Sequence, residues 1–215
     1  MEQIGRFLNS SVHKTNIRQA RGFTLIELLV VIAIVAVLSV VVILTLNPGE
    51  LLKQSRDSNR ISDLQTMKRA ISIYLVDVPT NNIWVGTTTW CYVHSSSAVA
   101  AAGCGTNRFS NAQLVATTSA AGFSSSSVGV DTGWVPVNLK AISSGAPMSL
   151  WPKDPINNAS YFYSYAPSST SLVFELNAEM ESIKYGLSGS GDVESTDGGN
   201  VSSTYEVGTA PGLSL

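Results

Sequence analysis

The sequence has few of the residues from which metal sites and many catalytic centres are built. Its 215 residues include two cysteines and two histidines. This leaves little material for zinc or iron–sulfur chemistry. Charged residues are also scarce, at 13% against about 25% in an average soluble domain. These shortages make a large share of enzyme classes a poor fit.

The few charges are unevenly distributed along the chain. Residues 1–22 carry four bases and one acid, a net charge of +3, while the remainder carries nine bases and fourteen acids, a net charge of -5. An acidic body is a poor electrostatic match for nucleic acid, because neutralisation of phosphates by lysine and arginine supplies most of that affinity. We therefore expect no nucleic-acid partner.

A long apolar run is the main feature that is present. Residues 28–46 contain no charge, and Ser39 and Thr45 are the only polar residues among these 19. Since about 20 helical residues cross a hydrocarbon layer of roughly 30 Å, the run predicts a transmembrane helix. A buried core helix is the alternative. Arg18 and Arg21 directly precede the run, which predicts a cytoplasmic N-terminus and an external body.

The run differs from an ordinary secretory signal peptide and from a plain membrane anchor. The apolar region of a signal peptide spans roughly 7–15 residues and ends at a small-residue cleavage site, whereas this run is longer and leads into a charged helix. Glu27 lies within the apolar stretch, where a carboxylate costs on the order of 2–3 kcal/mol or more. The segment contains no basic residue to pair with it.

The residues around Glu27 resemble a known targeting sequence. A basic leader, a glycine, a phenylalanine and a glutamate at the fifth position after that glycine occur together in RGFTLIELLVVIAI, residues 21–34. This combination resembles the class III signal of type IV pilins and type II secretion pseudopilins. The resemblance implies cleavage after Gly22 by a membrane aspartic prepilin peptidase, followed by N-methylation of Phe23. It also implies that Glu27 pairs with the new amino terminus of Phe23 in a neighbouring subunit, since a buried charge is tolerated when it is paired. A tolerated glutamate on a simple anchor is the alternative.

The pattern after the apolar run is that of an amphipathic helix over residues 47–78. Apolar residues recur every three or four positions, and charged residues are expected on the other faces. Asp57 with Arg60, and Asp63 with Lys68, are expected to form weak surface pairs at most.

The junction between the two helical patterns carries a helix-breaking pair. Pro48 and Gly49 predict a break, because proline lacks a backbone donor and clashes with the preceding turn. The resemblance supports this, since pilin helices carry a proline in this region and can unwind near it. A simple kink where the chain leaves the membrane is the alternative.

A connecting loop region rich in serine, alanine and glycine is predicted over residues 79–132. Its scattered aromatic residues favour a loop packed on the body over disorder. In an extracytoplasmic compartment Cys91 and Cys104 are expected to form a disulfide, which would stabilise the fold by roughly 3 kcal/mol. Two free structural thiols are the alternative.

A small antiparallel sheet is predicted over residues 133–207, followed by a flexible tail, residues 208–215. Residues 134–139 read as an edge strand, and residues 161–165 and 172–176 as a hairpin. Alternation places Leu172, Phe174 and Leu176 on the face that covers the helix. The expected fold is therefore α+β and pilin-like: a leader (residues 1–22), a hydrophobic half-helix (23–46) and an amphipathic half-helix (47–78) packed on the sheet.

No catalytic motif emerges from the sequence. The glycine-containing stretch at residues 103–108 lacks the third glycine of a dinucleotide loop, and no nucleophile elbow surrounds Ser188. We expect no enzymatic activity and no cofactor. Asp192, Glu194 and Asp197 are candidate Ca²⁺ ligands, an idea supported by the calcium site that some major pseudopilins carry near the C-terminus. A solvated acidic loop is the alternative.

These features favour a structural subunit of a type IV pilus-like filament. The expected partners are other copies of the chain, the prepilin peptidase, and an inner-membrane assembly platform with its assembly ATPase. The precursor would lie in the cytoplasmic membrane and the assembled subunit on the cell surface. The alternatives are a pseudopilin of a secretion or DNA-uptake machine and a membrane-anchored extracellular binding protein that does not polymerise.

Overall fold

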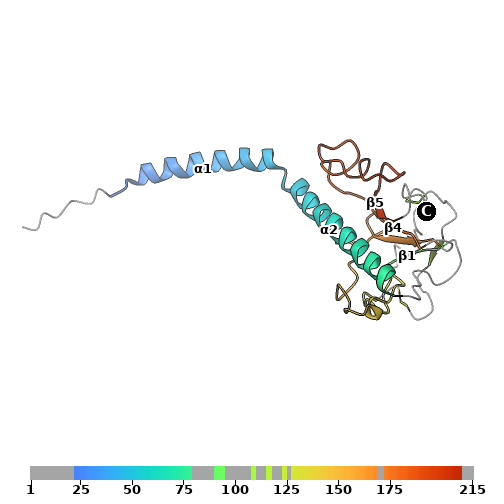
Figure 1. Ribbon diagram of the computed structural model, residues 1–215. Coiled ribbons are helices and arrows are strands. Elements are labelled where there is room, and N and C mark those ends of the chain that lie inside the picture. Colours follow the sequence, from blue (N-terminus) through green and yellow to red (C-terminus); the bar gives the residue numbers. More distant parts are fainter. Residues whose placement is uncertain are drawn as a thin grey trace, which may run out of the picture. The chain divides into compact units, whose positions relative to one another are not determined.

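The computed structural model describes residues 22–78, 90–94, 108–109, 115–117, 123–124, 127–168 and 172–209. The chain divides into two compact units, Met1–Leu46 and Asn47–Leu215. The first contains helix α1 (Leu25–Leu46). The second contains helix α2 (Pro48–Asp77), the short 3-10 helix η1 (Leu139–Ala141) and five strands (Figure 1): β1 (Trp90–Val93), β2 (Val115–Thr117), β3 (Ser164–Pro167), β4 (Phe174–Ala178) and β5 (Tyr205–Gly208).

A break in the backbone separates the two helices. Asn47 adopts the left-handed conformation, with φ 40° and ψ 74°, and Pro48 is the first residue of α2. Asparagine tolerates this conformation better than most residues, and proline suits the first helical position because an N–H there would have no helical partner. The predicted interruption is therefore present, but Asn47 makes it. The steric clash expected from Pro48 does not arise.

One face of α2 packs against one face of the sheet and forms the main core. The buried apolar residues of α2 recur at helical spacing: Leu64, Met67, Ala70, Ile71 and Tyr74. They share a cluster with alternate residues of the sheet, namely Tyr92, Tyr165, Phe174, Leu176, Ala178, Tyr205 and Val207. Figure 1 shows α2 alongside the strands. The predicted α+β arrangement, a long N-terminal helix followed by a small antiparallel sheet, is confirmed.

The sheet has the order β2-β1-β3-β4-β5. The pairs β1–β3, β3–β4 and β4–β5 are antiparallel, while β2 joins β1 in parallel. The predicted hairpin is β3–β4, with Pro167 opposite Phe174. Its strands begin two to three residues later than predicted, so Leu172 precedes β4 and is half exposed. Ala178 completes the inward face in its place.

Two parts of the sheet differ from the sequence-based expectation. Residues 134–139 are buried except for Asn138, but they do not form a strand. The backbone turns locally: the amide of Val137 bonds to the carbonyl of Val135 at 2.8 Å, and η1 follows. Conversely, β1 and β2 lie within the segment expected to be a connecting loop.

Candidate functional site

The expected processing junction, between Gly22 and Phe23, is exposed. Gly22 is exposed and Phe23 is 91% exposed. A Cβ atom added to Gly22 would meet nothing within 4 Å. Since the fold of the chain does not require glycine there, a requirement for glycine would have to come from a protein that binds this segment.

Glu27 closes a capping box at the start of α1. Its Oε2 atom accepts hydrogen bonds from the backbone amide and the hydroxyl of Thr24, each 2.7 Å long, and the Thr24 hydroxyl accepts from the amide of Glu27 at 3.3 Å. This reciprocal arrangement satisfies amide groups that the first helical turn leaves unpaired. The segment offers Glu27 no basic partner, but Thr24 supplies two hydrogen-bond donors. The spacing Thr24-x-x-Glu27 is the sequence signal that indicates this hydrogen-bonded partner of Glu27.

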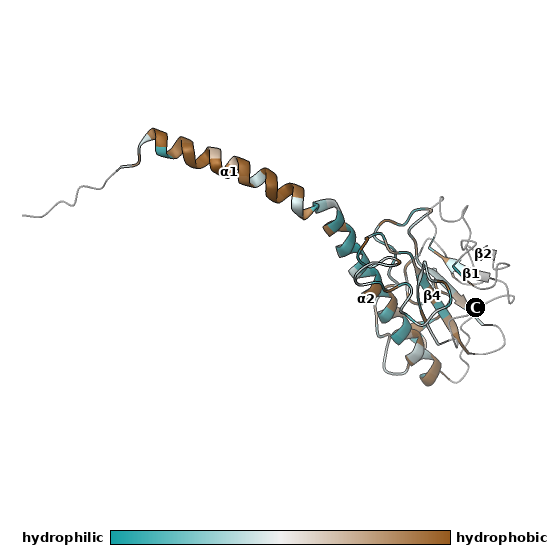
Figure 2. Cartoon of the chain, turned by 90° about the horizontal axis from the view of Figure 1, so that it is seen from above, coloured by the Kyte–Doolittle hydropathy of each residue, from teal (hydrophilic) through white to brown (hydrophobic). Residues whose placement is uncertain are grey.

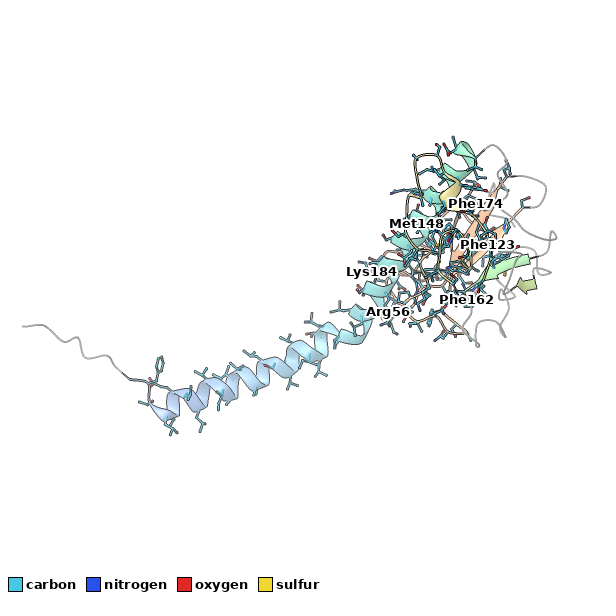
Figure 3. The ribbon with its side chains drawn as sticks, turned by 90° about the horizontal axis from the view of Figure 1, so that it is seen from below. Arg56, Phe123, Met148, Phe162, Phe174 and Lys184 are labelled. Atoms are coloured by element: carbon cyan, nitrogen blue, oxygen red, sulfur yellow. The ribbon has the colours of Figure 1, made fainter. Side chains whose placement is uncertain are left out.

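The rest of α1 is apolar on every side. None of its residues is buried. Figure 2 shows that hydrophobic residues run along the whole helix, and Figure 3 shows side chains projecting from its different sides. The hydroxyls of Ser39 and Thr45 bond to helix carbonyls one turn earlier, at 2.7 and 2.9 Å. With 22 residues, the helix is about 33 Å long, and among the described residues it is the one helix long and apolar enough to cross a membrane. A surface of this kind needs lipid or other helices around it.

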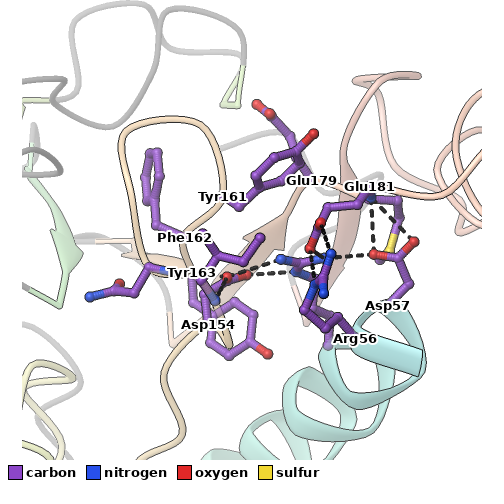
Figure 4. Close-up of polar contacts among 12 residues, drawn as sticks. Arg56, Asp57, Asp154, Tyr161, Phe162, Tyr163, Glu179 and Glu181 are labelled. Carbon is purple, nitrogen blue, oxygen red and sulfur yellow. Dashed lines mark hydrogen bonds and ion pairs between the residues drawn. The ribbon is translucent and has the colours of Figure 1, made fainter. Parts of the chain in front are cut away.

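The N-terminal half of α2 is fastened to the body by a buried ionic cluster. Arg60 is fully buried. Its guanidinium contacts Asp154 at 2.6 and 3.0 Å, Asp57 at 2.7 Å and Glu181 at 2.6 Å (Figure 4). We call Arg60 with these three carboxylates the Arg60 cluster. It joins α2 to two loops that lie far away in the sequence.

Further hydrogen bonds hold the same loops in place. Asp57 also accepts from the backbone amides of Glu181 and Ser182, the latter at 2.8 Å, and Arg56 contacts Glu181 at 2.7 Å. Burial alone would raise the pKa of Glu181, but hydrogen bonds from Arg56 and Arg60 outweigh it and leave the pKa below its ordinary value.

The expectation of weak surface pairs on α2 is therefore wrong for Asp57 and Arg60. Both side chains are fully buried in the Arg60 cluster. Asp63 accepts a hydrogen bond from the hydroxyl of Tyr163 at 2.9 Å, and burial raises its pKa.

The three candidate calcium ligands do not come together as a metal site. Within the described parts of the chain, no group of three or more histidine, cysteine, aspartate or glutamate side chains is placed to hold a metal. Each of the three carboxylates instead accepts backbone amides: Asp192 from residues 188, 194 and 195, Glu194 from residues 180 and 187, and Asp197 from residues 199 and 206. These carboxylates order a loop.

Of the two cysteines, the structure describes Cys91. Cys91 is fully buried in β1, in a small apolar cluster with Val93, Phe109, Phe162 and Ala166. Cys104 lies outside the described residues, as do residues 1–21 of the leader. The pairing of the two cysteines remains a prediction.

Comparison with known proteins gives one match, at the N-terminus. Residues 17–43 match the model of the prokaryotic N-terminal methylation motif. The matched stretch includes Gly22, Phe23, Glu27 and most of α1. Neither the curated proteins nor the solved structures contain a match to the chain. The motif supports a class III signal peptide of type IV pilins and pseudopilins, and it indicates a type IV pilin-like subunit.

Proposed function

We propose that the chain is a structural subunit of a type IV pilus-like filament, with no catalytic activity of its own. The prepilin peptidase removes residues 1–22, Phe23 becomes N-methylated, and α1 holds the subunit in the membrane until assembly. In the filament, α1 packs with the same helix of other copies, and the body with its sheet lies outside.

The observation that carries this proposal is the methylation motif at residues 17–43, read together with a helix α1 that has no buried residue. A helix of about 33 Å with apolar side chains on all sides suits both environments that a pilin helix occupies, first lipid and then a helical bundle. The exposed Gly22–Phe23 junction suits access by a peptidase.

The wider machinery follows from the same motif. We propose an inner-membrane assembly platform and its assembly ATPase as partners, a membrane precursor with its N-terminus inside the cell, and a cell-surface product. A pseudopilin of a type II secretion or DNA-uptake machine would carry the same N-terminal segment. The length of the filaments on cells, and the neighbouring genes, separate that role from a pilus.

One observation favours the third candidate, a membrane-anchored binding protein that does not polymerise. The capping box gives the Glu27 carboxylate two donors within its own chain, so a second subunit is not needed to make this residue tolerable. Glu27 by itself therefore supports polymerisation less strongly than the sequence suggested.

Intact-mass measurement of the membrane-extracted chain tests the processing step. We expect the wild type to lose residues 1–22 and to carry one methyl group on Phe23. Gly22→Lys should keep the leader, because a charged side chain does not fit a peptidase site that accepts glycine, and should still insert, because α1 is unchanged. Gly49→Ala is the control and should be processed normally. Loss of the leader from Gly22→Lys, or a wild-type chain that begins at Met1, would contradict the proposal.

A further inference from the structure

Exposed apolar side chains gather at the start of α2 and in the loop beside it. Leu51 and Leu52 lie within the first five residues of α2 and are 49% and 61% exposed, while Ile183 and Leu187 in the loop are 78% and 52% exposed. We call these four residues the apolar rim. They belong to the body, and the main core does not include them.

Hydrogen bonds fix this loop against the first turns of α2. The backbone amide of Ile183 donates to the Glu50 carboxylate at 2.6 Å, and the neighbouring amide of Ser182 donates to Asp57 at 2.8 Å. The ion pair between Arg56 and Glu181 is a third contact between α2 and this loop. Figure 3 accordingly places the labelled Arg56 and Lys184 near the N-terminal end of α2.

The covalent chain keeps the apolar rim close to the end of α1. Glu50 follows Leu46, the last residue of α1, by four residues. Four residues span at most about 14 Å even when fully extended. Whatever the orientation of the body, Ile183 therefore stays near the point where a membrane-spanning α1 leaves the hydrocarbon layer.

The charges beside the rim suit a lipid surface. Lys53 and Lys184 are exposed. Each nearby acid has its own partner: Glu50 accepts from the Ile183 amide, Asp192 accepts from the Ser188 amide, and Glu181 pairs with two arginines. Apolar side chains flanked by lysines are the composition of segments that lie at the headgroup boundary, where each lysine adds attraction to anionic lipids.

We propose that in the unassembled subunit the apolar rim rests on the membrane surface where α1 emerges, with Lys53 and Lys184 facing the headgroups. This contact gives the body a second attachment to the membrane besides α1. The proposal rests on the proposed function in one respect, namely that α1 spans a membrane.

The test uses the full-length chain, one copy per lipid nanodisc, with an environment-sensitive fluorophore on a single introduced cysteine. Ser190→Cys places the probe in the loop that carries Ile183 and Leu187, and it leaves all four residues of the apolar rim intact. The probe stays close to the rim because the amide of the next residue, Gly191, donates to the Lys184 carbonyl at 2.9 Å. Val76→Cys is the matched control: it is 90% exposed on the same helix, about 38 Å along the axis from Leu51. Val35→Cys reports on α1. The unmodified chain gives the background from the native cysteines.

Quenching by lipids that carry a quencher at headgroup depth is then compared among the three sites. We expect quenching at Ser190→Cys to exceed that at Val76→Cys several-fold, and quenchers at acyl depth to act strongly at Val35→Cys. Adding Ile183→Asp should remove most of the Ser190→Cys signal, whereas adding Val76→Asp should leave it unchanged. Discs without anionic lipid should weaken the signal.

The outcomes separate the two claims. If the Val35 probe is not quenched, the membrane anchor of the proposed function fails. If Val35 is quenched but Ser190 is quenched no more than Val76, the rim contact is wrong and the anchor stands. If the Ser190 signal changes only in discs that hold two chains, the rim binds a second copy, which also overturns the proposal.

Discussion

The Glu27 carboxylate bonds to both the amide and the hydroxyl of Thr24, at 2.7 Å each. It therefore caps the helix that carries the methylation motif. A neighbouring subunit that pairs its amino terminus with Glu27 would have to share or replace these two bonds. Glu27 thus caps α1 within its own subunit, in addition to the pairing with a neighbouring subunit that the pilin resemblance implies.

The Arg60 cluster is expected to be essential for the stability of the body. Arg60→Met removes the cation that pairs with both Asp57 and Asp154, and breaking a buried ionic group in this way costs roughly 3–5 kcal/mol. Lys140→Met removes a surface pair with Asp131, in which the lysine side chain is 63% exposed, and should cost less than about 1 kcal/mol. Urea unfolding of the full chain in detergent, followed by near-ultraviolet circular dichroism, measures both. Equal midpoints for the two variants would show that the cluster contributes no more than a surface pair.

The loop around Asp192 is expected to lose stability in acid. The amide of Ser195, then its hydroxyl and the amide of Ser188, hold the pKa of Asp192 below its ordinary value of 3.8. A carboxyl with a lowered folded-state pKa stabilises the fold above its ordinary pKa, and this contribution is lost as the pH falls through the folded-state value.

Comparison with Asp192→Asn isolates that contribution. The wild type should be more stable than Asp192→Asn at neutral pH, and the difference should shrink as the pH falls below 3.8. Urea midpoints of the two proteins across this range give the measurement. A difference that does not change with pH would mean that ionisation of Asp192 does not stabilise the loop.

The exported body is expected to contain one intramolecular bond between Cys91 and Cys104. Cys91 is fully buried, so it is poorly placed to link subunits. Removing the pair by Cys91→Ala with Cys104→Ala should lower stability by roughly 3 kcal/mol, part of which comes from the unfolded chain. Non-reducing gels and thiol titration of the unfolded protein test the pairing directly. Covalent dimers, or two free thiols per chain, would contradict it.

The sequence predicted well those elements whose signals are local. An unbroken apolar run predicted α1, apolar spacing predicted α2, and two β-rich runs around a turn predicted the β3–β4 hairpin. The spacing of Thr24 and Glu27 also indicates the capping box, because a threonine followed three residues later by a glutamate is its local signature.

The features that the sequence did not predict depend on distant partners. In the sequence, Arg60 and Asp57 have the pattern of surface residues. In the fold, Arg60 binds Asp154, which lies 94 positions away, and Asp57 accepts from the amide of Glu181, which lies 124 positions away. Residues 134–139 have the composition of a strand, but the backbone turns locally, and the apolar residues Trp134, Val135, Val137 and Leu139 join the core without joining the sheet.

The yield of sheared surface filaments, relative to processed protein in the membrane fraction, tests the central claim most directly. Two variants of Glu27 are needed. Glutamine serves in a capping box as glutamate does, so Glu27→Gln keeps the cap and removes the charge, while Glu27→Val removes both. Leader cleavage should survive in each, because Gly22 and Phe23 are intact.

If Glu27 aligns an incoming subunit through its charge, both variants should be processed and inserted, and both should lose most of their filaments. A normal yield from Glu27→Gln with a loss in Glu27→Val would reduce the role of Glu27 to capping and contradict the charge pairing. A normal filament yield from both processed variants would contradict any role of Glu27 in assembly, and the absence of filaments from wild-type cells that retain the processed protein would contradict the assignment as a filament subunit.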